Sequence, residues 1–379
     1  MKVCLLSTEI FAWGKYGGFG RATRTIGREL ARRGVGVSAV VPRRPGQGAV
    51  ELLDGITVFG YPMGAPWQAA RLCRAANAEI YHSQEPSTAT WLAMRAMPDR
   101  KHVVTLRDPH DWRDWRTELA HPSLSRVQVI ANMLYEDNPL VHRAVRRADR
   151  RFCAAHCIQP KVVAKYALPA PPPLLPTPVR VPAAVRKAER PTVCYLARWD
   201  RRKRPDLFFE LVARFHQVRF LAVGRSRDAA YDRHLRATYG HLPNLELTGF
   251  VDQFDSEELS AILGRSWIVV STAAREGLPN AFIEAAAHRC AILSGVDPDG
   301  FASRFGAWVE DGDFARGLAS LLEQDRWRAL GARGYAYVLE SFELNHAVDR
   351  HLAAYADLVA APPPVEWTPL QEGSPVALP

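Results

Sequence analysis

Two glutamates on either side of a Gly/Pro turn are the first candidates for chemistry. Glu276 and Glu284 are separated by seven residues in the stretch Arg275-Glu276-Gly277-Leu278-Pro279-Asn280-Ala281-Phe282-Ile283-Glu284. The flanking residues predict a buried strand over 266–271 and a helix over 281–288, with Pro279 at its start. Such a strand, loop and helix point free backbone N–H groups and the positive end of the helix at a cleft, which suits a diphosphate. The carboxylates can accept hydrogen bonds from sugar or ribose hydroxyls, so the pattern favours a site for a sugar nucleotide.

A pair of basic residues precedes this motif. Arg198 follows a strand predicted over 192–197, and Lys203 comes five positions later in the run Arg198-Trp199-Asp200-Arg201-Arg202-Lys203-Arg204. In an open α/β sheet, ligands bind beyond the carboxyl ends of the strands, so we expect both cations at the same crevice as the Glu276 loop. Arg198 and Lys203 are therefore candidates to stabilise the charge that grows on a departing diphosphate. A solvated basic turn is the competing interpretation.

Glycines mark two further loops at strand ends. Gly17 and Gly18, in the run Gly17-Gly18-Phe19-Gly20-Arg21, follow a strand predicted over 2–7, and Gly224 follows one predicted over 220–223. Without side chains, these positions let backbone N–H groups come close to a donor phosphate. Tight turning alone is the alternative, because Thr23 stands where a dinucleotide-binding Gly-x-Gly-x-x-Gly fingerprint would need glycine.

Two polar segments follow predicted strands over 79–82 and 102–106 at the same crevice. They are His82-Ser83-Gln84-Glu85-Pro86 and Thr105-Leu106-Arg107-Asp108-Pro109-His110-Asp111. Glu85, Arg107 and His110 are candidates for the acceptor side of the cleft. Arg107 would suit an anionic acceptor, whereas an ordinary loop histidine is the alternative for His110.

Strands and helices alternate around these residues. A helix with apolar residues at helical spacing over 19–30 lies between the first strand and a strand over 35–41, which makes a β-α-β unit. Further strands are predicted over 56–60, 245–249 and 291–294, and further helices over 66–76, 87–96, 138–149, 207–215 and 256–263. We therefore predict an α/β protein with two Rossmann-like doubly wound domains.

The predicted domains cover 1–168 and 191–345. Between them, residues 169–190 are rich in proline, which prevents a regular helix and favours an extended linker. Residues 325–359 predict two or more helices, the last of which covers 346–360. Residues 361–379 contain six prolines and few charges, and this composition predicts a disordered tail.

The composition is that of a soluble globular protein, with 47% hydrophobic and 23% charged residues. We expect no signal peptide and no transmembrane segment, because no apolar run approaches the ~20 residues that span a bilayer. The net charge is +9, and residues 1–168 hold 25 Lys and Arg against 14 Asp and Glu, so the first half carries the whole excess. A basic face favours an anionic partner, such as a phosphorylated acceptor or a membrane surface. We expect a cytoplasmic protein that can bind peripherally to the inner membrane surface.

Arginines at 143–151 follow helical spacing in part, which indicates either a solvated helix face or a surface that docks on a membrane or polyanion. Aromatic residues do not alternate with them, so we expect no nucleic-acid partner. The six cysteines do not form the pattern of a disulfide framework. Cys153 and Cys157 have no second Cys/His pair at zinc spacing elsewhere, so we expect no metal site.

Taken in order, these segments resemble the retaining glycosyltransferases of family 4, which have the GT-B fold. The stretch from Glu276 to Glu284 is similar to the family's Glu-x7-Glu signature. The segment from Arg198 to Lys203 is similar to its Gly-Arg-x4-Lys element, with Ala197 in place of the glycine. The resemblance covers residues 2 to about 355. It implies two domains that face a central cleft and a C-terminal helix that crosses back to the first domain.

The resemblance also implies an activity. A hexosyl group would move from a nucleoside-diphosphate sugar to a hydroxyl acceptor, with the anomeric configuration kept and without a metal or other cofactor. Arg198, Lys203 and Glu276 would be catalytic. The donor-binding residues would be Gly17, Gly18, Gly224, Gly277, Leu278, Pro279, Asn280 and Glu284. Many relatives carry a histidine where this chain has Arg107, so either Arg107 or His110 would take its place.

Other classes of protein share parts of this pattern. Another GT-B enzyme, such as an inverting transferase or a sugar-nucleotide epimerase, would have the same fold. A nicotinamide-dependent oxidoreductase would need an acidic residue after the second strand, where this chain has Val41-Pro42-Arg43-Arg44. A non-catalytic binder of sugar nucleotides or polyanions is the third alternative.

Overall fold

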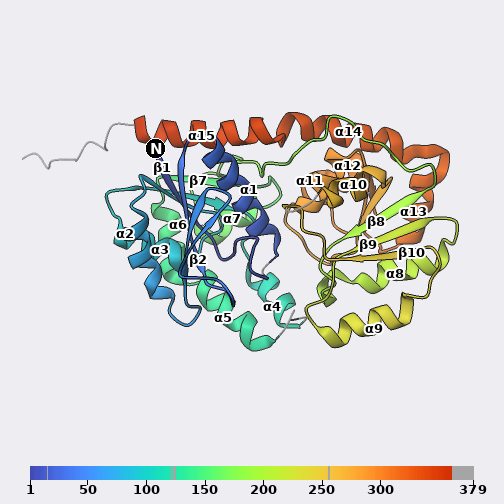
Figure 1. Cartoon of the computed structure of the whole chain (residues 1–379), viewed down its shortest axis with the longest axis horizontal. Coiled ribbons are helices and arrows are strands. Elements are labelled where there is room, and N and C mark those ends of the chain that lie inside the picture. Colours follow the sequence, from blue (N-terminus) through green and yellow to red (C-terminus); the bar gives the residue numbers. More distant parts are fainter. Residues whose placement is uncertain (15, 121, 123–124, 255–256, 361–379) are drawn as a thin grey trace, which may run out of the picture.

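Two β-sheets, one in each half of the chain, form the framework of the molecule (Figure 1). The structure is a computed structural model, and it describes residues 1–14, 16–120, 122, 125–254 and 257–360. The predicted tail, residues 361–379, lies outside the described residues. Each sheet is flanked by helices on both faces, and this arrangement confirms the predicted pair of doubly wound α/β domains.

The first sheet has seven strands in the order β3-β4-β2-β1-β5-β6-β7. All neighbouring pairs are parallel except β3, which forms an antiparallel hairpin with β4. The central strand, β1, is buried from Val3 to Leu6 because helices cover both of its faces. The strands are β1 (Lys2–Leu6), β2 (Gly36–Pro42), β3 (Val50–Leu53), β4 (Ile56–Tyr61), β5 (Ile80–Ser83), β6 (Lys101–Leu106) and β7 (Arg150–Cys153).

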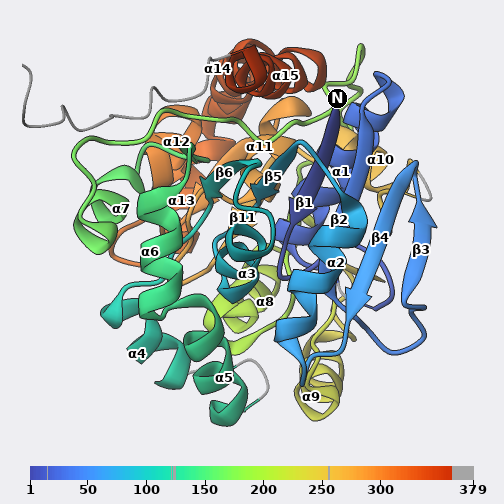
Figure 2. The same ribbon diagram turned by 90° about the vertical axis from the view of Figure 1, so that its left-hand side faces the viewer.

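Seven helices belong to this domain within the described residues: α1 (Gly18–Arg32), α2 (Ala69–Ala76), α3 (Thr88–Ala96), α4 (Trp112–Ala120), α5 (Arg126–Glu136), α6 (Pro139–Arg147) and α7 (Gln159–Tyr166). A short 3-10 turn, η1 (Pro66–Gln68), precedes α2. Figure 2 views this domain end on and places α4 and α5 at the end of the domain opposite to α15.

The second sheet has six parallel strands in the order β10-β9-β8-β11-β12-β13. They are β8 (Thr192–Leu196), β9 (Arg219–Val223), β10 (Leu245–Gly249), β11 (Ile268–Ser271), β12 (Ala291–Ser294) and β13 (Gly306–Trp308). The helices are α8 (Pro205–Arg214), α9 (Ala229–Tyr239), α10 (Glu258–Arg265), α11 (Asn280–Ala287), α12 (Phe301–Phe305), α13 (Phe314–Leu322) and α14 (Arg326–Ser341). Three 3-10 turns are η2 (Arg201–Lys203), η3 (Pro298–Gly300) and η4 (Glu323–Asp325).

The last helix, α15 (Leu344–Ala360), returns to the first domain, as Figure 1 shows along the top of the molecule. Its side chains Val348, Tyr355 and Leu358 are buried in the core of the first sheet. Tyr355 also contacts the ring of His82 in β5, with 2.6 Å between the phenol oxygen and Nδ1. This arrangement confirms the predicted crossing of the C-terminal helix.

The proline-rich segment between α7 and β8 runs along both domains. Leu174 bridges to Cys153 of β7, and Val179 bridges to Glu343 next to α15. Leu175 and Thr177 are buried. Among the described residues, no helix is long and apolar enough to cross a membrane.

Candidate active site

A cavity of about 480 Å³ lies between the two domains, where the carboxyl ends of both sheets face each other. In each sheet the strand order changes direction beside the first strand, β1 or β8, and a crevice forms at this point in doubly wound sheets. The loops after these strands therefore reach the cavity. Twelve of the residues singled out from the sequence line it, namely Gly17, Gly18, Arg107, His110, Arg198, Lys203, Gly224, Glu276, Gly277, Leu278, Pro279 and Asn280.

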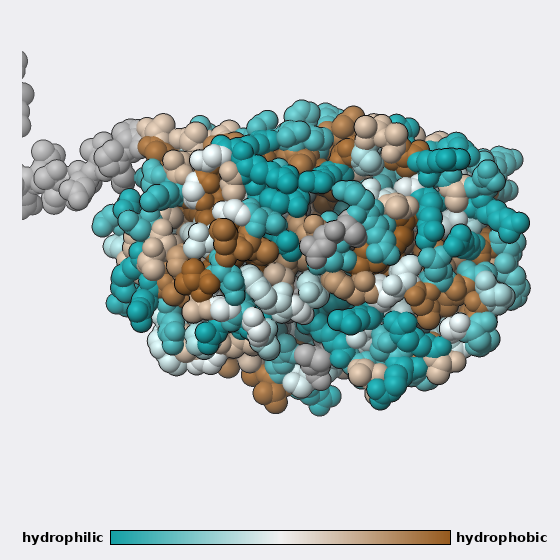
Figure 3. All heavy atoms as spheres, in the orientation of Figure 1, coloured by the Kyte–Doolittle hydropathy of each residue, from teal (hydrophilic) through white to brown (hydrophobic). Residues whose placement is uncertain are grey.

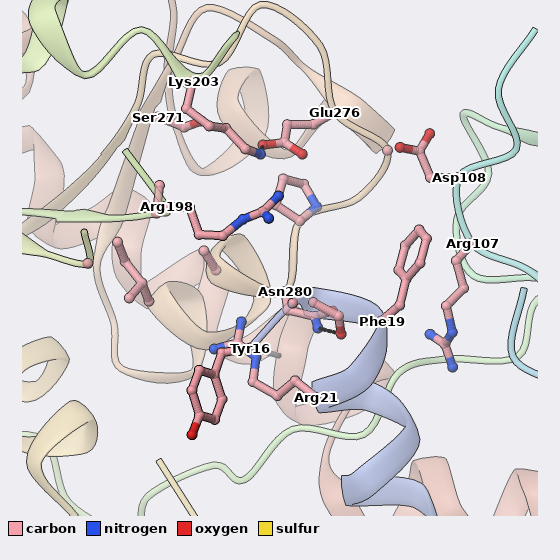
Figure 4. Close-up of a pocket in the computed structure, with 18 of the residues that line it drawn as sticks. Tyr16, Phe19, Arg21, Arg107, Asp108, Arg198, Lys203, Ser271, Glu276 and Asn280 are labelled. Carbon is pink, nitrogen blue, oxygen red and sulfur yellow. Dashed lines mark hydrogen bonds and ion pairs between the residues drawn. The ribbon is translucent and has the colours of Figure 1, made fainter. Parts of the chain in front are cut away.

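The two predicted cations lie side by side in this cavity (Figure 4). Arg198 follows β8, and its guanidinium lies 3.2 Å from the buried carboxylate of Asp200. Lys203 ends the 3-10 turn η2, and its ammonium pairs with the carboxylate of Glu276. Two of the proposed catalytic residues thus contact each other directly.

Three cations gather at this point, and each has a carboxylate partner: Lys203 pairs with Glu276, Arg198 with Asp200 and Arg202 with Glu118. The pKa of Lys203 is lowered to about 7, mainly by burial, and the nearby guanidinium groups of Arg202 and Arg198 contribute to this shift in the same direction. An anionic ligand beside Lys203 would favour its protonated form and raise this pKa again. The electrostatics of the pocket therefore suit a multiply charged anion such as a diphosphate.

The Glu276 loop enters the cavity as the link between β11 and α11. A Cβ atom at Gly277 would lie 3.1 Å from the carbonyl oxygen of Arg107, so the glycine lets the two domains approach closely here. The side chain of Asn280, the first residue of α11, donates a hydrogen bond of 2.9 Å to the carbonyl of Gly18. The N-termini of α1 and α11 thus meet at the cavity, where both helix dipoles favour an anion.

Glu284 lies apart from the wall of the large cavity. It lines a small adjoining hollow together with Asn280 and Arg21, and Arg21 of α1 lies 3.1 Å from its carboxylate. Burial raises the pKa of Glu284, whereas the charge of Arg21 lowers it. A ribose hydroxyl can reach this carboxylate only if Arg21 shares it or moves away.

Glu85 does not line the large cavity either. Its buried carboxylate accepts hydrogen bonds from the backbone N–H groups of Arg107 (2.6 Å) and Asp108 (3.1 Å). Burial raises the pKa of Glu85 to about 8, although these two hydrogen bonds oppose the shift. Glu85 therefore holds the loop after β6 in place behind the cavity wall.

Arg107 and His110 differ in how they face the cavity. The guanidinium of Arg107 is buried and donates to the side chains of Thr177, at 2.7 Å, and Gln84. Burial lowers its pKa to about 10. The ring of His110 stacks on Trp115 with centroids 4.5 Å apart, and burial lowers its pKa. The guanidinium of Arg107 thus bonds to internal partners, whereas the ring of His110 lies against Trp115 at the cavity wall.

In the described part of the chain, no group of three or more His, Cys, Asp or Glu residues is arranged so that it could hold a metal ion. Cys157 is exposed, whereas Cys153 is buried in β7.

Two family models match the chain, one in each domain. Residues 16–181 match the model described as "Glycosyltransferase Family 4". Residues 190–324 match the model described as "Glycosyl transferases group 1". The two matches meet at the cleft described above. The chain belongs to the GT-B glycosyltransferases.

Solved structures of similar fold support this assignment of the fold. Sucrose-phosphate synthase from Thermosynechococcus elongatus has a TM-score of 0.72 and 17% identity, and the match covers 95% of this glycosyltransferase and 99% of that chain. The Anabaena protein HepE in complex with UDP-glucose has a TM-score of 0.69 and 13% identity, with 94% and 100% covered. A glycosyltransferase from Rickettsia africae has a TM-score of 0.65 and 13% identity, with 94% and 98% covered. None of the curated protein sequences matches this chain.

Several residues of the glycosyltransferase cavity were not singled out from its sequence. They include Tyr16, Phe19, Arg21, Asp108, Arg202, Arg227, Phe250 and Arg275. The rings of Tyr16 and Phe250, from different domains, lie 4.3 Å apart between centroids. Position next to a motif residue was a usable signal for most of them, because Tyr16, Phe19, Asp108, Arg202 and Arg275 each adjoin a residue singled out from the sequence, whereas Arg227 and Phe250 had no such signal.

Ion pairs across the cleft hold the two domains of the glycosyltransferase together. Arg275 bonds to Asp108 at 2.6 Å and also to Asp114. Arg202 pairs with Glu118 of α4. On another side of the cleft, the carboxylate of Asp299 accepts hydrogen bonds from the backbone N–H groups at 156 (3.0 Å) and 157 (2.6 Å). The structure therefore represents a closed arrangement of the two domains.

Proposed function

We propose that this GT-B glycosyltransferase is a retaining family 4 enzyme. It transfers a hexosyl group from a nucleoside-diphosphate sugar to a hydroxyl acceptor. The observation that carries the proposal is the ion pair of Lys203 and Glu276 beside Arg198, opposite the N-termini of α1 and α11. Cations and helix ends on two sides would bind the diphosphate, and an acidic side chain beside it would bind the sugar.

Each residue then has a defined role. Lys203 and Arg198 stabilise the negative charge on the leaving diphosphate, which makes a divalent metal unnecessary. Glu276 turns from Lys203 to the sugar hydroxyls when the donor arrives, and the backbone of 277–280 contacts the sugar and phosphate. Glu284 binds the ribose once Arg21 shares its carboxylate. His110 lies on the acceptor side of the same cavity.

The ion-paired state of three cavity carboxylates bears on the route by which the anomeric configuration would be kept. Asp108 pairs with Arg275, Glu118 with Arg202, and Glu276 with Lys203. A carboxylate held by a cation is a poor nucleophile, so a double displacement through one of them is disfavoured. A front-face route fits better, in which the acceptor hydroxyl attacks on the side of the leaving group and the diphosphate takes its proton.

The donor and the cellular location belong to the same proposal. The similar structure of HepE contains UDP-glucose, and we propose a uridine diphosphate sugar as the donor here. The excess of basic residues in the first half of the chain supports a cytoplasmic enzyme that contacts the inner membrane surface.

Product analysis tests the reaction. The purified enzyme is incubated with UDP-, GDP-, ADP- and dTDP-sugars and with simple glycoside acceptors, and NMR reports the anomeric configuration of the product. The proposal predicts the same anomer as in the donor. Glu276→Ala should lower turnover about a hundredfold, whereas Glu310→Ala, at an exposed position outside the cavity, should not.

Other products would identify the alternatives. An inverted anomer would mean an inverting transferase, and a changed sugar on an intact nucleotide would mean an epimerase. Binding of a sugar nucleotide without any release of diphosphate, in the wild type and in Glu276→Ala alike, would mean a non-catalytic binder.

A further inference from the structure

One face of the first domain exposes large apolar side chains on three consecutive helices. The exposed fractions are 66% for Trp112 on α4, 77% for Val127, 45% for Ile130 and 63% for Leu134 on α5, and 39% for Leu140 on α6. Helix α5 is mostly turned outward, because Val129 is its only buried residue. Figure 3 shows hydrophobic atoms at the lower edge of the molecule, where Figure 1 places α5. Single exposed apolar residues are ordinary, but a group on neighbouring helices marks an interaction surface.

The exposed charges on the same helices all have one sign. Between residues 112 and 147, the exposed charged side chains among the described residues are Arg113, Arg116, Arg126, Arg143, Arg146 and Arg147. Three of the four acidic residues of this segment pair with internal cations. Asp114 bonds to Lys161, Glu118 to Arg202, and Asp137 to Lys165. The face therefore combines apolar side chains with arginines whose positive charge is not neutralised by exposed acidic side chains among the described residues of these helices.

This docking face, defined as the outer side of α4, α5 and α6, adjoins the active-site cavity. Trp115 and Glu118 of α4, with Val129 and Asn132 of α5, line that cavity from the inside. The same two helices thus separate the cavity from the docking face. Figure 2 shows α4, α5 and α6 gathered on one side of the first domain.

We propose that the docking face binds the surface of an anionic lipid bilayer. Apolar side chains of α5 would insert at the boundary between headgroups and acyl chains, and the arginines would bind the lipid phosphates. A second copy of this chain fits less well. A two-fold symmetric contact through the same face would bring arginines of both copies together, with their acidic neighbours already paired internally.

The docking has a consequence for the reaction. A bilayer at α4 and α5 would hold a lipid-borne acceptor beside the cavity, on the side where His110 and Glu118 lie. This consequence rests on the proposed transfer reaction. The docking of this face on a bilayer does not depend on that reaction, so vesicle binding tests the docking separately from catalysis.

Co-sedimentation with vesicles is the direct test. The full chain is mixed with vesicles of phosphatidylglycerol and phosphatidylcholine, and in parallel with vesicles of phosphatidylcholine alone. We expect binding to the anionic vesicles that weakens as salt rises, and at least tenfold weaker binding to the neutral ones. Arg116→Gln should weaken the anionic partition about fivefold, because one arginine near a charged surface contributes about that factor.

The apolar part of the face has its own variants. Ile130→Glu and Leu134→Glu should each reduce vesicle binding at least tenfold, because a carboxylate is repelled by the lipid phosphates and cannot enter the acyl boundary. Leu339→Glu is the matched control, since Leu339 is 41% exposed on α14 of the other domain, and it should bind as the wild type does. Circular dichroism and the thermal shift with UDP confirm that each variant is folded.

Three results would overturn the inference. They are equal binding to both kinds of vesicle, absence of binding to either, and unchanged binding of Ile130→Glu. A dimer in sedimentation velocity that Leu134→Glu dissociates would assign the face to a second copy instead. If vesicle binding fails while transfer to a soluble acceptor proceeds, the docking and the proposed contact with the membrane are wrong, and the proposed transfer reaction stands.

Discussion

Lys203 is the residue whose surroundings bear most directly on the reaction. Its ammonium lies between Glu276, which favours the charged form, and a buried pocket with Arg198 and Arg202, which disfavours it. Burial dominates and brings its pKa to about 7. The free enzyme is therefore poised between a protonated and a neutral Lys203 near neutral pH, and only the protonated form can stabilise a leaving diphosphate.

This balance predicts a pH dependence. The ratio kcat/KM for the donor reports the free enzyme, so it should fall as pH rises above about 7, where Lys203 loses its proton. Lys203→Arg keeps its charge at high pH, and its profile should stay flat from pH 7 to 9 even if its rate at pH 6 is lower. If kcat/KM falls in the same way with rising pH in the wild type and in Lys203→Arg, a group other than Lys203 is responsible for the titration.

Glu85 gives a second prediction, about how the stability of the protein depends on pH. The folded protein keeps this proton up to about pH 8, whereas the unfolded chain releases it near the ordinary glutamate pKa of 4.5. Folding thus takes up a proton between these values, and the Glu85 contribution to the free energy of unfolding decreases as pH rises from about 5 to 8. Glu85→Gln removes this contribution, so its melting temperature relative to wild type should rise across that window.

The size of this effect is on the order of 1 kcal/mol per pH unit. Calorimetry at several pH values measures it. Glu310→Gln, at an exposed glutamate, should follow the wild type at every pH. A constant difference between Glu85→Gln and wild type would show that Glu85 is ionised in the folded protein throughout.

At the scale of elements, the loops after β8 and β9 are packed against each other. Gly224 has a φ of 128°, and a Cβ atom there would lie 1.9 Å from the carbonyl oxygen of Ala197. Gly224→Ala combines backbone strain with a collision, and it should cost at least about 2 kcal/mol of stability and weaken donor binding. Gly64→Ala is the control, because open space surrounds Gly64, and its effect should stay within about 0.5 kcal/mol. Equal melting temperatures for the two variants would refute this account of the loop.

The sequence predicted those elements whose residues carry a strong local pattern. Apolar runs located β1, β2, β8, β9, β11 and β12 to within a residue or two, because strands buried on both faces are nearly all apolar. The strands β4 and β10, which are less completely buried, were located equally well. The predicted helix over 138–149 ended too late, since α6 stops at Arg147 and the chain enters β7. The strand β7 was not predicted, because Arg150 and Arg151 at its start interrupt the apolar pattern of a buried strand. The exposed apolar face of α5 does not fit the usual helix pattern, so α5 was not predicted.

The candidate site was predictable to the extent that its motifs are local. Gly277 to Asn280 reach the cavity with Glu276 because a single loop carries them all. Contacts between the domains could not be predicted, because Arg21 and Glu284 are far apart in the sequence and meet only after both domains fold. The burial of Glu85 and of the Arg107 guanidinium also follows from packing that a one-dimensional pattern does not contain.

At the scale of the whole molecule, Arg275 links the loop of Glu276 to the first domain. It precedes Glu276 directly, and its guanidinium bonds to Asp108 and Asp114 of the other domain. Charge-assisted hydrogen bonds of partly buried groups contribute about 2 kcal/mol. Arg275→Met should therefore open the molecule and raise the donor KM about tenfold or more. Small-angle X-ray scattering should show a larger radius of gyration than for the wild type.

The matched control for closure is Arg328→Met. Arg328 is 65% exposed on α14 and pairs with Asp325 within its own domain, so this change should leave both scattering and KM unchanged. A donor KM that rises for Arg275→Met without any change in scattering would assign Arg275 to donor contact and not to closure.

We propose that the cleft binds a pyrophosphate group between Lys203, Arg198 and the two helix ends. Calorimetric titration tests it most directly, with UDP and UMP added to the wild type, to Lys203→Ala and to Arg201→Ala, an exposed neighbour. The account predicts that the wild type and Arg201→Ala bind UDP at least about tenfold more tightly than UMP, and that Lys203→Ala loses most of this preference. Equal affinities for UDP and UMP in the wild type, or an undiminished preference in Lys203→Ala, would contradict it.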